Sequence, residues 1–199
     1  MMENRRIEIL HAFSSIVARH GVNRTTMRDV AKETGYSIGT IYNEFANKEA
    51  LIDGLFEQKK IEFEKLLLHL SGVCHAESEM RLRRFILGYI QEYNQKMRQD
   101  YAFVELVRDA RYFRFIGLKA VDFNQFIRRK VLAILEGILQ AGVQAESFCI
   151  TDIAVTAIVI LNAFTMYLLP SPAAEKHSDS IAKEAEAMLE LFIKALRTR

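Results

Sequence analysis

Proline and glycine are scarce in this chain: only two prolines and nine glycines occur among its 199 residues. A sheet with many turns would need more of both, so the scarcity favours long helices joined by short connections. No stretch alternates apolar and polar residues as a half-buried strand does. Half of the residues are hydrophobic, which is enough to bury a substantial core. We therefore expect an all-α protein.

Cysteine is also rare, and long apolar runs are nearly absent. Cys74 and Cys149 lie far apart without a paired framework, which favours a reduced, cytoplasmic protein. Charges interrupt the N-terminus at once, so it lacks the apolar core of a secretory signal. Residues Ile153–Leu169 are almost entirely apolar, but they barely reach the roughly 17 to 25 residues that span a bilayer, and polar side chains interrupt them. We expect a buried helix there and no membrane association.

Motifs for catalysis and metal binding are missing as well. The chain has no phosphate-cradling glycine loop, no nucleophile elbow and no HExxH motif. One group of metal-ligating residue types, His69, Cys74, His75 and Glu77, has a spacing that matches no zinc pattern. The sequence therefore predicts neither an enzyme, nor a metal site, nor a cofactor.

The most informative stretch is residues 25–51, TTMRDVAKETGYSIGTIYNEFANKEAL. Thr26 followed by Asp29 fits a capping box, so a helix should begin at Thr26. Gly35 should end that helix, because glycine adopts the left-handed conformation at little cost. Ser37 can cap a second helix. Two short helices joined by such a turn form a helix-turn-helix, in which the second helix lies in the major groove of DNA.

The second helix of this pair should have two distinct faces. Ile41 and Phe45 are four residues apart and form an inward pair. Gly39 is a poor helix former, at a cost of about 1 kcal/mol relative to alanine, which suggests that a base edge or a phosphate approaches the backbone there. The outward side chains are polar: Ser37, Thr40 and Asn43.

Spacing and charge alone leave an alternative open. Short helix pairs with a glycine turn occur in many all-helical proteins, and a polar helix face is usually solvated surface. Residues 1–50 carry seven Lys/Arg against six Asp/Glu, and the whole chain has a net charge of +2, so no basic patch indicates DNA. Neutral donors and helix N-termini also bind phosphate, however, and a dimer doubles the contacts.

Residues 35–45, GYSIGTIYNEF, and then 48–51, KEAL, closely resemble the TetR/AcrR family of bacterial transcriptional regulators. The resemblance covers about the first quarter of the chain. It implies that Ser37, Gly39 and Thr40 meet base edges or nearby phosphates. It further implies that Tyr42 holds a phosphate through its hydroxyl, and that Lys48 does so at the start of the next helix.

The helix before the turn would contact the DNA backbone through Thr26 and Arg28. Two residues depart from the family pattern: Tyr36 stands in place of a small aliphatic residue and Ile38 in place of a polar or basic one. Ile38 could contact a thymine methyl group or pack on the face of the inward pair. The candidate DNA-binding residues are Thr26, Arg28, Ser37, Ile38, Gly39, Thr40, Tyr42, Asn43 and Lys48.

Apolar periodicity predicts helices along the rest of the chain as well. We expect a small helix-turn-helix DNA-binding domain over residues 1–52 and a larger helical ligand-binding and dimerisation domain over 53–199. Pro170–Asp179 is the clearest loop. A first helix should end near Gly21, and a second should run from near Asn47 to about Leu70. A third is expected through Leu82–Met97. Two more should follow, one through Phe123 and Ile138 that ends at Gly142, and one through Ile181–Leu196.

The segment Tyr101–Phe126 is crowded with aromatic residues and arginines. Aromatic side chains there could enclose an apolar ligand, although core packing is the commoner explanation. The family resemblance implies that the larger domain senses a small molecule, without naming it. The candidate ligand-binding residues are Phe103, Tyr112, Phe113, Phe126 and Met166.

A dimer interface is expected near the C-terminus. Residues Thr151–Leu169 are apolar nearly all round, more than one domain core covers, and the last helix has an apolar stripe with Met188 and Phe192. Two such helices from each chain would make a four-helix interface, as in the resembled family, with Asn162 helping to set its register.

The sequence as a whole predicts a cytoplasmic, homodimeric regulator that binds a palindromic operator in double-stranded DNA. We expect a repressor released by a small hydrophobic or amphipathic effector. An activator or a ligand-blind regulator is the alternative within regulation. From another class, the alternative is a helical-bundle protein that binds small molecules without regulating DNA.

Overall fold

The computed structural model describes residues 2–72, 77–100, 102–104, 113–168 and 178–197. Within these ranges every regular element is a helix and no strand occurs, so the expected all-α fold is confirmed. The chain forms two compact units. Unit 1 comprises Met1–Glu62 and Gln99–Phe126, and unit 2 comprises Phe63–Arg98 and Ile127–Arg199.

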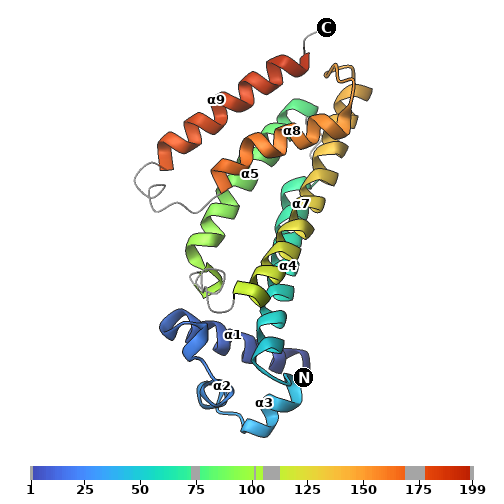
Figure 1. Ribbon diagram of the computed structural model, residues 1–199. Coiled ribbons are helices and arrows are strands. Elements are labelled where there is room, and N and C mark those ends of the chain that lie inside the picture. Colours follow the sequence, from blue (N-terminus) through green and yellow to red (C-terminus); the bar gives the residue numbers. More distant parts are fainter. Residues whose placement is uncertain (1, 73–76, 101, 105–112, 169–177, 198–199) are drawn as a thin grey trace. The chain divides into compact units, whose positions relative to one another are not determined.

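Unit 1 contains the helices of the predicted helix-turn-helix. These are α1 (Met2–His20), a short 3-10 turn (Val22–Arg24), α2 (Met27–Thr34), α3 (Ile38–Glu44) and the first half of α4 (Lys48–Ser71). Figure 1 shows α1, α2 and α3 gathered beside the start of α4. An apolar core no more than 2% exposed holds them together: Ile9, Phe13, Val17, Val30, Ile41, Phe45, Leu51 and Ile52.

Unit 2 is built from the rest of α4 and four further segments. These are α5 (Ser78–Gln99), α7 (Phe113–Gln144) from Ile127 onward, α8 (Ile153–Thr165) with a following 3-10 turn (Met166–Leu168), and α9 (Ser178–Arg197). Ion pairs tie α5 to α9, from Arg83 to Glu190 and from Arg197 to Glu79. The core of the unit includes Leu67, Leu82, Phe85, Leu135, Leu139, Ile160, Leu189 and Ile193.

One predicted helix end is wrong. Gly142 does not terminate α7, which continues to Gln144. The left-handed residue that follows is Glu146, with φ 54°. Gly142 is needed for packing instead, because a Cβ there would lie 2.0 Å from Cδ2 of the buried Phe148 ring.

The apolar stretch near the C-terminus forms a shorter helix than predicted. Instead of Thr151–Leu169, α8 covers Ile153–Thr165, with Asp152 as its N-cap accepting from the amide of Val155 at 2.9 Å. Among the described residues, no helix is both long enough and apolar enough to cross a membrane. Most of the loop predicted over Pro170–Asp179 lies outside the described residues, and its last two residues begin α9.

Candidate nucleic-acid interface

The capping box at the start of α2 is confirmed. The amide of Thr26 donates to Oδ2 of Asp29 at 2.8 Å, and the amide of Asp29 donates to Oγ1 of Thr26 at 3.3 Å. The hydroxyl of Thr26 also donates to that carboxylate, at 2.7 Å. The two hydrogen bonds that the carboxylate accepts from Thr26, the one from the hydroxyl foremost, lower the pKa of Asp29. A negative charge is thus held at the N-terminus of α2, where the helix dipole favours it.

The turn between the two helices also follows its sequence. Gly35 has φ 73° and ends α2 in the left-handed conformation. Ser37 caps α3: its Oγ accepts from the amide of Thr40 at 3.1 Å and lies 2.8 Å from the Thr40 hydroxyl. A hydroxyl has one donor and two acceptor positions, so both side chains keep capacity for a further partner.

Helix α3 presents one buried and one exposed face. Ile41 is fully buried and Phe45, which follows the helix, is 2% exposed, as expected for an inward pair. Ile38 is 40% exposed, so it is not buried as that pair is. Tyr42 is 52% exposed. We call the outward residues the recognition surface: Ser37, Ile38, Gly39, Thr40, Tyr42 and Asn43.

Gly39 is not required by the fold. A Cβ built on it would have Ser37 Oγ as its nearest neighbour, at an ordinary contact distance of 3.8 Å. Alanine would therefore fit at this position and would favour the helix. A close approach by another molecule is a physical reason for glycine there, and it remains our prediction.

Lys48 has protein partners in this structure. Its Nζ donates to the carbonyl oxygens of Val22 and Thr25, at 3.0 Å each. The side chain thereby ties the start of α4 to the segment before α2. Its contact with a phosphate stays a prediction. That contact would require the ammonium group to donate to a phosphate as well as to these two carbonyl oxygens. Arg28, by contrast, lies exposed on α2, close in sequence to Thr26.

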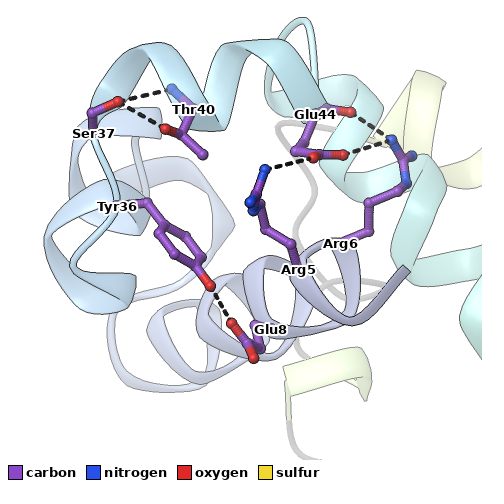
Figure 2. A network of polar contacts seen from close by, with 7 residues as sticks. All are labelled: Arg5, Arg6, Glu8, Tyr36, Ser37, Thr40 and Glu44. Carbon is purple, nitrogen blue, oxygen red and sulfur yellow. Dashed lines mark hydrogen bonds and ion pairs between the residues drawn. The ribbon is translucent and has the colours of Figure 1, made fainter. Parts of the chain in front are cut away.

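The sequence did not reveal the residues of α1 that hold α3 in place. Figure 2 shows Arg5 and Arg6 beside Glu44 at the end of α3, and Glu8 beside Tyr36 just before its start. The Tyr36 hydroxyl donates to Glu8, which raises the pKa of the tyrosine. The one signal in the sequence was the departure of Tyr36 from the family pattern.

The structure does not gather the predicted ligand-binding residues in one unit. Phe103 and Phe126 belong to unit 1, whereas Met166 belongs to unit 2 and is 64% exposed. Tyr112 and the side chain of Phe113 lie outside the described residues. Phe103 is a buried core residue: its ring lies 5.1 Å from that of Phe56 and 5.4 Å from that of Phe123, and both contacts are edge-to-face.

Unit 2 contains a different aromatic cluster, which sequence reasoning treated only as helix periodicity. The ring of Tyr93 lies 5.5 Å from Phe63 and 5.8 Å from Tyr89, and Phe85 stacks on Tyr89 at 6.2 Å. Burial raises the pKa of both tyrosine hydroxyls. The four rings are apolar, and the hydroxyls of Tyr89 and Tyr93 are the polar groups among them. We call these four residues the unit 2 aromatic cluster.

The group of metal-ligating residue types is only partly described. Cys74 and His75 lie outside the described residues. In the described part of the chain, no three His, Cys, Asp or Glu side chains form a group that could hold a metal ion.

Two family models match this chain. The model of bacterial regulatory proteins of the tetR family matches residues 9–55. The model of the tetracyclin repressor-like C-terminal domain matches residues 78–189. Together they include the recognition surface and most of unit 2.

Curated relatives are similar over most of the chain. The probable acrEF/envCD operon repressor of Escherichia coli K12 is 26% identical over 167 residues, which cover 80% of this chain and 72% of the relative. The fatty acid metabolism regulator protein of Bacillus subtilis 168 is 24% identical over 147 residues, which cover 70% of this chain and 68% of the relative.

Solved structures share the fold. A regulator from Pseudomonas aeruginosa PAO1 matches with a TM-score of 0.69 at 18% identity, covering 99% of this chain and 92% of that one. A SmeT–triclosan complex matches with a TM-score of 0.65 at 19% identity, covering 96% and 90%. FadR from Bacillus subtilis in complex with stearoyl-CoA matches with a TM-score of 0.59 at 20% identity, covering 94% and 97%.

Proposed function

Because the chain belongs to the TetR family of bacterial regulatory proteins, and is thus a DNA-binding transcriptional regulator, we propose that it is a repressor released by a small hydrophobic or amphipathic effector. The observation that carries the DNA-binding part is the exposed recognition surface on α3, opposite the buried Ile41 and Phe45. Residues 1–52 would bind DNA, and residues 53–199 would bind the effector and a second copy. The protein would act in the cytoplasm and would not be an enzyme.

The proposed mechanism depends on spacing. A homodimer would place two α3 helices about one turn of DNA apart, facing the two halves of a palindromic operator. An effector that binds one arrangement of the dimer more tightly than the other shifts the balance between them, and operator affinity falls by the same coupling free energy.

Changes at Thr40 and Tyr42 should separate base reading from phosphate binding. Thr40→Ala should change the relative affinity for operator variants, since a hydroxyl near base edges affects sequence preference. Tyr42→Phe should weaken binding to all duplexes alike, by about three- to tenfold, since it removes one hydrogen bond to a phosphate. The upstream region of the protein's own coding sequence would be footprinted to locate the site that the protein protects. Gel-shift titrations on that site and on variants of it would measure both effects.

Ser71→Ala provides the matched control. Its hydroxyl donates to the carbonyl of Leu68 within α4, at 3.1 Å, and lies outside the recognition surface. Operator binding by this variant should equal that of the wild-type chain. If folded Thr40→Ala and Tyr42→Phe variants both bind like the wild type, the recognition surface is assigned wrongly. If the wild-type chain binds no specific duplex, DNA regulation is excluded and small-molecule binding alone is left.

The effector class is supported by the unit 2 aromatic cluster. Phe63, Phe85 and Tyr89 are at most 6% exposed, so these rings would have to move apart to admit an effector. An interior of aromatic rings with two hydroxyls would then suit a molecule with a long apolar part and a polar end. Two structural neighbours are complexes with small molecules that have a large apolar part: triclosan, and stearoyl-CoA with its long acyl chain. One relative is a regulator of fatty acid metabolism.

Stearoyl-CoA and triclosan are therefore the probes. At about 100 times its Kd, an effector should raise Tm by about 5 to 10 °C and lower operator affinity. Tyr93→Ala should reduce both responses while leaving operator binding without probe nearly unchanged. Tyr167→Ala is the control, since it removes a buried ring that packs on Phe164 outside the cluster. No Tm shift with either probe would contradict this class, and a Tm shift without loss of operator affinity would contradict the switch.

A further inference from the structure

Side chains from the first turns of α1 contact both ends of α3 (Figure 2). At the start of α3, the hydroxyl of Tyr36 donates to the carboxylate of Glu8. The guanidinium of Arg5 lies over the same tyrosine ring, 5.8 Å from its centre. Tyr36 directly precedes the N-cap residue Ser37, so these contacts locate the point at which α3 begins.

The other end of α3 is held by the same turns of α1. Nη1 of Arg6 donates to the backbone carbonyl of Glu44 at 2.7 Å, which satisfies one of the carbonyls that a helix C-terminus leaves open. The Glu44 carboxylate lies 3.7 Å from both Arg5 and Arg6, and its side chain is only 14% exposed. The Arg6 guanidinium also stacks over the ring of Phe45, 4.3 Å from its centre. We call Arg5, Arg6 and Glu8 the α1 clamp.

These contacts from α1 matter because α3 is short. It has seven residues, about two turns, and a helix of this length has little stability of its own. Within α3 only Ile41 is buried, and apolar contacts are non-directional. Directed hydrogen bonds at both ends restrict how the helix can turn about its axis.

We propose that the α1 clamp sets the orientation in which α3 meets DNA, so that Arg6 and Glu8 are positioning residues for operator recognition. This inference rests on the proposed DNA-binding role of α3. Groups that read a ligand must be held within about 0.5 Å of the productive geometry, and a helix that turns loses its base contacts before its general attraction to DNA. The clamp therefore contributes to sequence discrimination without touching a base.

Three variants test the proposal against a matched control. Arg6→Ala releases the end of α3, and Tyr36→Phe or Glu8→Ala releases its start. Arg19→Ala is the control: the Arg19 side chain is 50% exposed, as is that of Arg6, and its 2.6 Å ion pair with Glu33 joins α1 to α2 rather than to α3.

The probe is a duplex carrying the operator, located by footprinting the upstream region of the protein's own coding sequence or selected from random duplexes. Each clamp variant should bind it about tenfold more weakly and discriminate less between operator variants, whereas Arg19→Ala should stay within about twofold of the wild type. Glu8→Gln, which keeps an acceptor for Tyr36, should recover most of the affinity lost in Glu8→Ala.

Non-specific DNA distinguishes positioning from direct contact. If Arg6 itself bound a phosphate, Arg6→Ala would weaken binding to unrelated duplexes as well, and the slope of log affinity against log salt would shrink by about 1. That result would overturn the proposal. The clamp predicts unchanged affinity for unrelated duplexes and an unchanged slope.

Amide hydrogen exchange tests the clamp without any DNA. Amides of Ile41 and Phe45 should exchange faster in the clamp variants than in the wild type, relative to the amide of Val30 in α2. Unchanged exchange and unchanged operator discrimination in the variants would refute the clamp. If no duplex is bound specifically by the wild-type chain, but exchange in α3 rises as described, the clamp holds α3 and the proposed function has failed.

Discussion

Val159→Glu should give a chain that sediments as a monomer or aggregates and that no longer binds operator DNA, although its helix-turn-helix is intact. Val155, Ile158 and Val159 leave one face of α8 apolar and 37% to 53% exposed in the single chain. If this face packs against a second copy, a carboxylate at Val159 is desolvated without a partner, which costs about 3 to 5 kcal/mol. A monomer brings only one recognition helix to a two-part site and loses most of its affinity.

The structure selects Val159 over its neighbour for this test. Ile160 is fully buried within its own chain, so Ile160→Glu would unfold the protein whether or not a dimer exists. Val121→Glu is a suitable control, because Val121 is also about half exposed but lies on α7 in unit 1. Analytical ultracentrifugation and gel shifts on the three chains would measure both effects. A wild-type chain that is monomeric at micromolar concentration, with full operator affinity, would refute the dimer.

Gly39→Ala should stabilise the free protein and at the same time weaken operator binding. The added methyl group fits the free structure, with its nearest neighbour at 3.8 Å, and alanine favours a helix by about 1 kcal/mol over glycine. If a base edge or phosphate approaches the backbone at Gly39, the methyl group overlaps it, at a cost of about 1 to 3 kcal/mol. Operator affinity should then fall by about five- to 150-fold.

Gly137→Ala is the matched control for this change. Gly137 lies within α7, is exposed, and would have no heavy atom within 4 Å of an added Cβ. It should gain the same stability and keep full operator affinity. Thermal unfolding and gel-shift titration of both variants provide the comparison. Operator binding by Gly39→Ala at wild-type strength would show that no DNA atom approaches that backbone.

Local rules of the sequence were sufficient for the helix-turn-helix. The capping box of Thr26 and Asp29, the left-handed Gly35 and the cap at Ser37 are all observed where the residue types indicated. Each of these features depends on residues no more than a few positions apart. The buried pair of Ile41 and Phe45 follows from helical periodicity in the same way.

Rules of that kind are weaker where a residue has a packing role. Gly142 was expected to end a helix, but the ring of Phe148 occupies the space of its missing side chain. Phe103 was grouped with candidate ligand-binding residues, and it packs in the core of unit 1 against Phe56 and Phe123. Residue type and spacing do not distinguish an aromatic that encloses a ligand from one that fills a core.

The sequence by itself determined that this chain is all-helical and where its recognition helix begins, because caps, turns and periodicity act between near neighbours along the chain. Only the tertiary structure decided which groups hold that helix in place. Arg6 lies 38 residues from Glu44, and Tyr36 lies 28 residues from Glu8. It also decided that Val159 faces outward while Ile160 is buried. Such contacts depend on how distant segments pack together, and no local pattern of residue types encodes that packing.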